Sequence, residues 1–309
     1  MLRAPPHPRL STRCTPLPPL PPCRRKADDP RAAKFAALPG VTLYAGDLTS
    51  AADVAGALAG VTRCMLVSGA FSHDQFEAES LFIEAAARAG VEVTVRVSTH
   101  SGLIKAGTKG AYGRTHHGLQ AFIEAGKYRV VDLCPDWFFT NWLGSAGEAK
   151  ATGKISLPVA GDGARVSMID PRDVGTAAAA ILQLPTPALA PLLAKRRLEV
   201  KGATRCNFKD VAEALSQAVG YPIALNPVPR DAWLAVLMGY GVPRVFATSF
   251  LETYEQCAGV VPPGYEVYGP ELLAGWETET SPELLALGWR AKTLQEWANA
   301  PATKAAFSK

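Results

Sequence analysis

Residues 61–98 read VTRCMLVSGAFSHDQFEAESLFIEAAARAGVEVTVRVS, and this stretch decides the fold class of the 309-residue chain. Its first part, 61–68, and its last part, 91–98, are short apolar runs rich in valine, which is typical of buried strands. Between them, Ser72 and Gln75 have the spacing of a capping box, and apolar residues then recur at helical spacing. A strand, a helix and a second strand in this order predict a βαβ unit with parallel strands.

The same alternation continues on both sides of this unit. Strands are predicted at 41–45, 128–134, 197–200 and 223–228, with two short ones within 155–169, and helices at 28–38, 51–58, 110–125, 136–149, 170–184 and 207–220. The rest, to Trp297, is predicted to be mostly helical. The sequence therefore predicts an α/β protein with a doubly wound, Rossmann-like parallel sheet and a small, mostly helical C-terminal lid. Ligands of such sheets bind at the carboxyl ends of the strands.

One part of this fold is not found in the sequence, so the sheet is expected to be N-terminally incomplete. A strand that runs into a glycine-rich loop normally precedes the other elements and holds a pyrophosphate with its backbone amides. Residues 1–26, MLRAPPHPRLSTRCTPLPPLPPCRRK, stand there instead, with eight of the 25 prolines. Proline at this density excludes a helix or a ladder strand, so we expect this leader to be disordered and outside the fold.

Two interpretations of the leader stay open. Its arginines and lack of acids are typical of an organelle transit peptide, which would place the protein in a plastid or mitochondrion. A mistranslated or mis-spliced start that replaces the first βα unit would instead leave a cytoplasmic protein. The second interpretation is favoured, because a transit peptide does not explain the missing strand.

Composition excludes several classes of protein. The formal net charge is +4, but the leader contributes six basic residues and no acid, and the remaining 26 basic and 28 acidic residues leave −2. Nucleic-acid binding is therefore not expected, and no apolar run reaches the length of a membrane span. The six cysteines show no Cys-x-x-Cys spacing. We expect buried free thiols in a reducing compartment.

Four blocks carry a family likeness: 38–61, with its Gly-Asp-Leu turn, 112–126, 134–143 and 161–182. In this order they resemble the NmrA-like branch of the atypical short-chain dehydrogenase/reductase superfamily. The likeness covers about 27–300, so we expect 27–309 to form one such domain, with 203–309 mostly forming the substrate cleft and lid.

The resemblance implies a Rossmann fold that binds NADP or NAD and a reductase of small, quinone-like substrates. The family also includes redox sensors that bind the dinucleotide without turning it over, so the resemblance is equally consistent with a sensor. A chain that lacks the glycine loop and binds no cofactor is the third alternative. The expected partner is a small-molecule substrate, with no nucleic acid and no membrane, and a homodimer stays open.

The resemblance also suggests site residues. Asp47 and Leu48 form the turn that lies near the adenine in the family, and Ser68, Gly69, Ser98 and Pro135 end strands where a cofactor would approach. Tyr112 and His116 have the superfamily's Tyr-x-x-x-Lys spacing, with histidine for lysine. Thr99 would supply the superfamily's hydroxyl. The candidate catalytic residues are Tyr112, His116 and Thr99, and His116 is also a candidate cofactor contact.

Each of these residues has a structural alternative. Asp47 is placed to cap the following turn, Thr99 to bond the local backbone, and a neutral imidazole at 116 is a poor substitute for a lysine cation. Gly107-x-x-Gly110-x-x-Gly113 matches the missing motif as a string, but it starts nine residues beyond Ser98 and is interpreted as a loop. Gly161-x-Gly163 predicts a hairpin turn. No metal-binding motif occurs in the sequence.

Overall fold

The computed structural model of the chain describes residues 17–20, 35–69, 74–104, 110–262 and 278–309. Its main sheet has four parallel strands in the order β3-β4-β5-β7. These strands are β3 (Arg63–Leu66), β4 (Val93–Val97), β5 (Val130–Pro135) and β7 (Arg197–Val200). The predicted parallel α/β sheet is confirmed.

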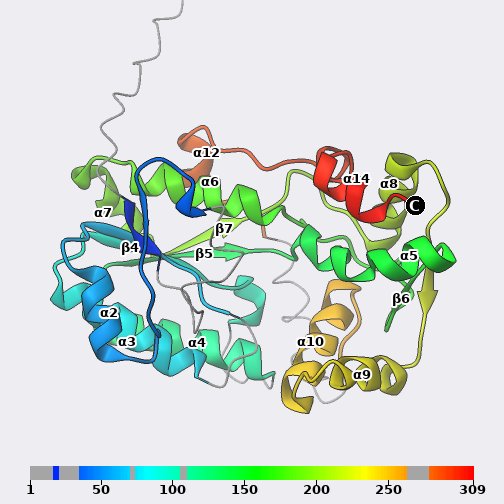
Figure 1. Cartoon of the computed structure of the whole chain (residues 1–309), viewed down its shortest axis with the longest axis horizontal. Coiled ribbons are helices and arrows are strands. Elements are labelled where there is room, and N and C mark those ends of the chain that lie inside the picture. The colour runs from blue at the N-terminus through cyan, green and yellow to red at the C-terminus, as the bar shows by residue number, and fades with distance from the viewer. Residues whose placement is uncertain (1–16, 21–34, 70–73, 105–109, 263–277) are drawn as a thin grey trace, which may run out of the picture.

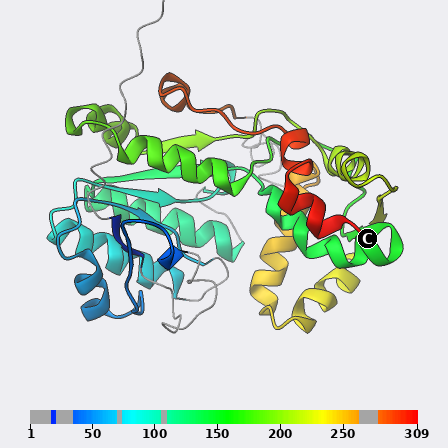
Figure 2. The same cartoon turned by 45° about the horizontal axis from the view of Figure 1, so that its top comes forward.

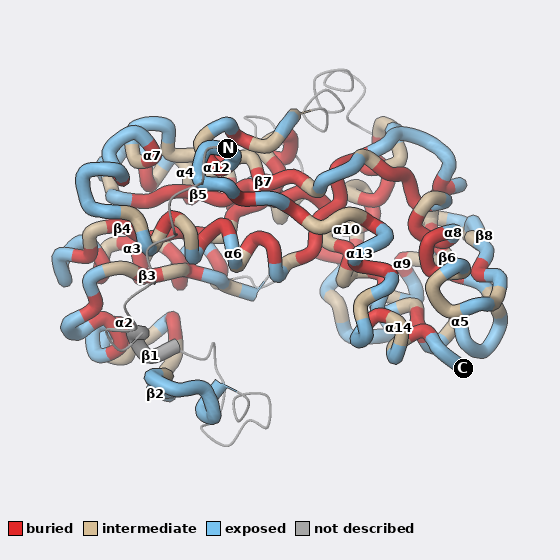
Figure 3. The backbone as a smooth tube through the Cα atoms, turned by 90° about the horizontal axis from the view of Figure 1, so that it is seen from above, coloured by how far each residue is buried: buried red, intermediate tan, exposed pale blue. Residues whose placement is uncertain are grey.

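Helices cover both faces of this sheet (Figure 1). On one face lie α2 (Ala51–Leu58), α3 (Gln75–Arg88) and α4 (Ala111–Ala125). On the other lie α6 (Pro171–Leu182), α7 (Ala190–Lys195) and α12 (Pro282–Ala286), with the 3-10 turn η3 (Thr186–Leu189) before α7. Covered on both faces, the central strands are deeply buried, as Figure 3 shows for β4 and β5, and most of their residues are apolar for that reason.

The remaining elements form a second lobe beside the carboxyl ends of the strands, seen on the right of Figures 1 and 2. It contains α5 (Ala146–Thr152), β6 (Lys154–Leu157), α8 (Phe208–Val219), β8 (Ala224–Pro227), α9 (Arg230–Gly239), α10 (Arg244–Cys257), α13 (Leu294–Ala298) and α14 (Pro301–Phe307). Two short 3-10 turns, η1 (Ser101–Leu103) and η2 (Phe139–Ser145), lead from the sheet toward it. The lobe therefore draws on 146–157 as well as on the C-terminal third.

Capping residues and local sequence pattern predicted several of these elements accurately. Asn207 and Asp210 cap α8 reciprocally, and Gly220 ends it in the left-handed conformation at φ 76°, as a capping box and a C-terminal glycine predict. The predicted bounds of α2 and β7 agree with the structure residue for residue.

The N-terminal part differs from the expectation. Residues Leu17–Leu20 form a strand, β1, that pairs in parallel with β2 (Val41–Leu43), so the exclusion of any ladder strand from the leader is wrong there. The register moves three residues along β1 and two along β2, which is a bulge, and a bulge accommodates a proline that cannot donate to the ladder. This pair is separate from the main sheet. The rest of the leader, Ser72 and most of the helix predicted at 28–38 lie outside the described residues.

The helix predicted over 136–149 is wrong at its start, since residues 136–138 are not helical and the helix begins as a 3-10 turn. The backbone stays extended through Phe138, because Phe139 N–H donates to Ile169 O and Ile169 N–H donates to Trp137 O, both at 2.9 Å. Only η2 and then α5 are helical. A contact between segments 30 residues apart overrides the local helical pattern, so the residues after β5 pass along the sheet edge.

The hairpin predicted around Gly161 is wrong too. β6 pairs in parallel with β8 rather than with a strand after the turn. Gly161 has a φ of +90°, and a Cβ on Gly163 would lie 2.0 Å from Ala258 O. These glycines are needed for close packing, Gly161 beside Leu225 and Phe208 and Gly163 beside the end of α10, and not because the chain reverses there.

Candidate functional site

A cavity of about 150 Å³ opens where the carboxyl ends of β4 and β5 meet the second lobe. The sheet contributes the residues that follow each strand, α4 contributes its first turn, and α10 forms the opposite wall. The lining residues are Ser98, Thr99, His100, Leu103, Tyr112, Pro135, Asp136, Trp137, Phe138, Asn141, Ser249, Phe250 and Thr253. Most of this surface is apolar and aromatic, and it lies where open α/β sheets bind ligands.

The cavity brings together only part of the candidate site. Ser98, Thr99, Tyr112 and Pro135 line it, and His116 lies directly behind Tyr112, with ring centroids 4.7 Å apart in an edge-to-face arrangement. The other four candidates, Asp47, Leu48, Ser68 and Gly69, do not line it.

Asp47 and Leu48 have structural roles. Asp47 accepts hydrogen bonds from the backbone and hydroxyl of Thr49, and its own N–H donates to Asp53. This is the turn-capping alternative that the sequence left open. The Leu48 side chain is buried in a core cluster with Val54 and Phe82, so a ligand could meet only its backbone.

Behind the strand ends lies a buried ionic network that the sequence analysis missed. The Arg96 guanidinium is fully buried and pairs with Glu79 of α3 at 2.9 Å and with Asp132 of β5 at 2.7 Å. A buried charge needs such partners, since an unpaired one is very costly. The sequence does contain a signal of this network, since each of two mostly apolar strands carries one charged residue. These residues, Arg96 and Asp132, are register partners in the sheet.

This network holds the two strand-end serines. Arg96 Nη2 donates to Ser98 Oγ at 3.1 Å, Ser68 Oγ donates to Glu79 Oε1 at 2.5 Å, and Gln75 donates to both Ser68 and Glu79. Ser68 therefore uses its hydroxyl proton inside the protein. It can accept a hydrogen bond from a ligand hydroxyl but has no proton to offer a phosphate. Gly69, next to it, is exposed, and no atom would meet a Cβ there.

His116 is buried and uncharged. Its Nδ1 lies 3.4 Å from Ser98 Oγ. Ser98 Oγ accepts a hydrogen bond from Arg96, so its own hydroxyl proton is available to His116. Burial lowers the pKa of His116 well below 6.5, and the nearby Arg96 charge lowers it further. His116 therefore supplies no positive charge to Tyr112.

Tyr112 keeps its proton. Burial raises the pKa of its hydroxyl, and a hydrogen bond with the Thr99 side chain acts in the opposite direction. The arrangement differs from a tyrosine activated by a lysine cation, because the neighbouring His116 is neutral and Tyr112 keeps its proton available for donation.

A second buried cluster, also missed by the sequence analysis, lies under the cavity. Asp136 accepts backbone N–H bonds from Trp137 at 2.6 Å and Ser167 at 3.2 Å, and its Oδ2 is 4.0 Å from both His100 Nε2 and Lys201 Nζ. Burial raises the pKa of Asp136, and the Lys201 charge opposes this. Gly102 N–H donates to His100 Nδ1 at 2.9 Å, so a neutral His100 carries its proton on Nε2. These side chains are almost fully buried and support the floor of the cavity.

The other sequence motifs have structural roles or lie outside the described residues. Gly110 is the N-cap of α4 and Gly113 is buried in its first turn, whereas Gly107 is outside the described part. Four cysteines, Cys64, Cys134, Cys206 and Cys257, are buried free thiols as expected. Among the described residues no cluster has the make-up of a metal site, and no helix is long and apolar enough to span a membrane.

The described residues fit one end of a nicotinamide dinucleotide. The cavity has apolar and aromatic walls that suit an aromatic ring, with Ser98 and Thr99 among its lining residues. No strand of the described sheet runs into a glycine-rich loop, so the described part of the chain offers no cradle for a pyrophosphate.

Comparison with known proteins identifies the family. The NmrA-like family model matches residues 23–261, and the chain therefore belongs to the NmrA-like family. The NAD(P)H azoreductase of Xenophilus azovorans is 29% identical over 263 residues, which cover 85% of this chain and 83% of the azoreductase.

Solved structures show the same fold at low sequence identity. The NADPH-dependent quinone oxidoreductase QOR2 of Escherichia coli, complexed with NADPH, superposes with a TM-score of 0.64 at 20% identity, covering 87% of each chain. The triphenylmethane reductase of Citrobacter sp., complexed with NADP(H), has a TM-score of 0.64 at 18% identity, covering 89% of this chain and 87% of that one.

Proposed function

We propose that this member of the NmrA-like family is an NAD(P)H-dependent oxidoreductase that reduces a small, planar, quinone-like substrate. The observation that carries the proposal is the aromatic-walled cavity at the carboxyl ends of β4 and β5. A flat, uncharged ring gains from contact with the rings of Trp137 and Phe250 and leaves no charge of its own to neutralise.

The nicotinamide ring would lie against Ser98, Thr99 and Pro135, and when bound it would supply a hydride. Ser98 cannot shift freely, because Arg96 holds its hydroxyl from behind. Pro135 ends β5 as the register partner of Val200, which fixes the backbone at that edge of the cavity. These residues bind and orient the ring.

Tyr112 would hold the proton that the reduced substrate needs. Its hydroxyl is protonated at neutral pH, as for any tyrosine, and burial raises its pKa further, while Thr99 orients it. A substrate oxygen or nitrogen within hydrogen-bond reach would accept this proton as negative charge develops there. His116 supports the Tyr112 ring by its edge-to-face contact and remains neutral.

The names of the relatives support a reductase without selecting the substrate. One is an NAD(P)H azoreductase, one an NADPH-dependent quinone oxidoreductase and one a triphenylmethane reductase. We place a quinone-like molecule first because Trp137 and Phe250 on the cavity wall suit a flat, uncharged ring.

The test is NADPH consumption, followed by absorbance, with a quinone, an azo dye or no acceptor. We expect quinone-dependent oxidation at millimolar NADPH, and Tyr112→Phe should lower kcat about a hundredfold or more, which is the usual contribution of a general acid. Tyr240→Phe is the matched control, since Tyr240 is 82% exposed and does not line the cavity.

The alternatives give different results. A dinucleotide sensor would bind NADPH without oxidising it with any acceptor, and a chain that cannot hold the cofactor would do neither. Either result would refute the reductase.

A further inference from the structure

We propose that the Phe250 side chain sets how large a ring system the cavity accepts, which makes it a specificity-determining residue. The proposal rests on the proposed function, because it concerns the substrate of the same cavity. Phe250 lies in the second turn of α10, half-buried, and lines the cavity with Ser249 and Thr253.

Phe250 divides the cavity from a cluster of aromatic side chains. Its ring stacks on Trp137, with centroids 5.5 Å apart and planes 13° apart. It also contacts Trp233 at 5.8 Å and Tyr254 at 5.2 Å. Trp137 lines the cavity, but Trp233 and Tyr254 do not. The Phe250 ring therefore lies between the cavity and a further set of aromatic surfaces.

The position of this wall is fixed. Tyr112 N–H, in the first turn of α4, donates to Ser249 Oγ at 3.3 Å. The N-cap of α4 is Gly110, which has no side chain to accept hydrogen bonds from the backbone N–H groups of the first turn. Ser249 of a distant helix does so instead, which holds the next residue, Phe250, at a set distance from α4. A substitution of Phe250 should thus change the size of the cavity and not the placement of α10.

The cavity walls opposite Phe250 are held in fixed positions. Ser98 and Pro135 belong to strand ends whose hydrogen bonds and register hold them in the sheet, and Trp137 is buried with its backbone tied to Ile169. Shortening Phe250 extends the cavity toward Trp233 and Tyr254. The added space is aromatic and apolar, and it favours a second fused ring.

The test measures binding, so that it does not depend on turnover. Duroquinone has one ring, and dimethylnaphthoquinone adds one fused ring to the same quinone. Their dissociation constants are measured by quenching of tryptophan fluorescence in the full chain. In Phe250→Ala, the affinity for the two-ring quinone relative to the one-ring quinone should rise about tenfold or more, the usual scale for a change in pocket size.

Phe246→Ala is the matched control. Phe246 is a buried aromatic residue one turn earlier in α10 and does not line the cavity, so the affinity ratio should stay at the parent value. If circular dichroism shows that Phe250→Ala is unfolded, Phe250→Leu is measured and must shift the ratio in the same direction. An unchanged ratio in a folded Phe250 variant, or an equal shift in Phe246→Ala, would overturn the proposal.

The two proposals fail separately. A shifted ratio without NADPH oxidation in the parent chain would support the Phe250 assignment and refute the reductase. Quinone-dependent NADPH oxidation with an unchanged ratio would support the reductase and refute the Phe250 assignment.

Discussion

Buried charges and imidazoles at the strand ends decide what the individual side chains of this site can do. Arg96 neutralises two carboxylates in the centre of the protein and holds Ser98 through Nη2, which also donates to Asp132. The same positive charge, added to burial, keeps His116 neutral. A histidine at the lysine position of the superfamily pattern therefore acts through shape and hydrogen bonding, not through charge.

This has a measurable consequence for stability. The pKa of His116 is depressed in the folded chain, whereas an unfolded histidine titrates near ~6.5. The unfolded state then binds more protons below about pH 6.5, so the stability from neutral His116 is fully present above that pH and is lost as the pH falls. For one group the slope approaches ~1.4 kcal/mol per pH unit. The free energy of unfolding of His116→Gln, measured in urea, should fall less steeply between about pH 6.5 and 5 than that of the parent chain.

His117→Gln removes an imidazole from the neighbouring, half-buried position and serves as the control. Parallel pH curves for His116→Gln and the parent chain would show that His116 does not carry this linkage.

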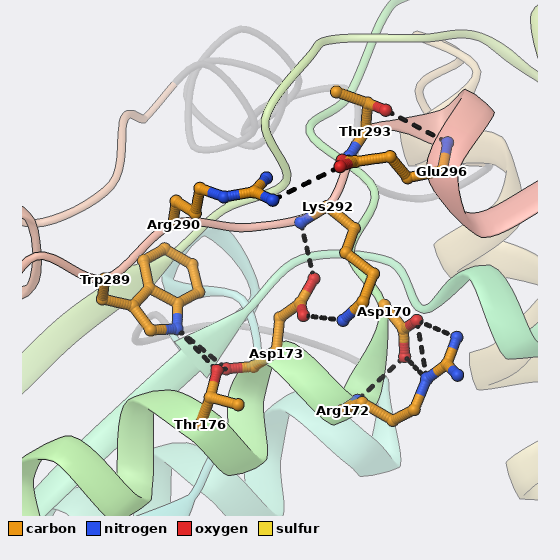
Figure 4. A network of polar contacts seen from close by, with 9 residues as sticks. All are labelled: Asp170, Arg172, Asp173, Thr176, Trp289, Arg290, Lys292, Thr293 and Glu296. Atoms are coloured by element: carbon orange, nitrogen blue, oxygen red, sulfur yellow. Dashed lines mark hydrogen bonds and ion pairs between the residues drawn. The ribbon is translucent and has the colours of Figure 1, made fainter. Parts of the chain in front are cut away.

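Among the elements, the first turn of α6 binds the segment of the chain that precedes α13. Figure 4 shows Asp173, in the first turn, paired with Lys292 and accepting its backbone N–H at 2.7 Å. The indole of Trp289 donates to Asp173 O at 2.9 Å, and Asp170 caps the helix. This segment carries the family's Ile-Asp-x-x-Asp pattern. Its acids have structural roles, fastening the chain that leads to α13 and α14.

Replacing Asp173 should therefore loosen the C-terminal segment. Asp173→Ala removes two hydrogen bonds to a buried carboxylate and should lower the free energy of unfolding by about 1.5–3 kcal/mol. Urea unfolding measures the loss, and limited proteolysis should cut more readily before α13. Arg290→Ala in the same segment breaks only an exposed ion pair with Glu296 and should cost no more than about 1 kcal/mol. Equal effects of the two substitutions would contradict the role given to Asp173.

For the whole molecule, the question is how much of a dinucleotide the chain can hold. The described sheet ends at β3, and the nearby β1–β2 pair is separate from it. The cavity lies at the carboxyl ends of β4 and β5, and Ser68, which follows β3, donates its hydroxyl proton to Glu79. We therefore expect the described residues to bind the ring end of the cofactor better than its phosphates.

We accordingly expect weak binding of the complete cofactor. A glycine loop gives several charge-assisted bonds to phosphate at ~1.5–3 kcal/mol each, so three missing bonds cost about 4–9 kcal/mol, where ~1.4 kcal/mol is a tenfold change in affinity. Calorimetry should show no saturable NADPH or NADH binding below millimolar, and reduced nicotinamide mononucleotide should bind within about tenfold of NADPH.

A variant with a strand and a Gly-x-x-Gly-x-x-Gly loop grafted before residue 27 is the positive control, expected to gain micromolar affinity. Micromolar NADPH binding by the unaltered chain would contradict the prediction. It would direct attention to Gly107, Gly110 and Gly113 as a substitute loop.

The sequence by itself determined the fold class, the parallel order of strand and helix, and the end of the strands at which to look. These depend on local periodicity, caps and glycines, which act over a few residues, as at Asn207 and Gly220 of α8. Ser98, Thr99 and Pro135 became candidates for the same reason, since each ends or follows a predicted strand, whereas Tyr112 was suggested by the family resemblance.

Only the tertiary structure decided which side chains meet. Arg96, Glu79 and Asp132 come from three elements, and their pairing depends on strand register and helix placement. Phe250 lies 113 residues beyond Trp137 and reaches it only because α10 docks on α4. The extended path through Phe138, against a helical local pattern, is fixed by backbone bonds to Ile169. Burial and pairing of this kind arise from contacts distant in sequence, and local pattern carries no record of them.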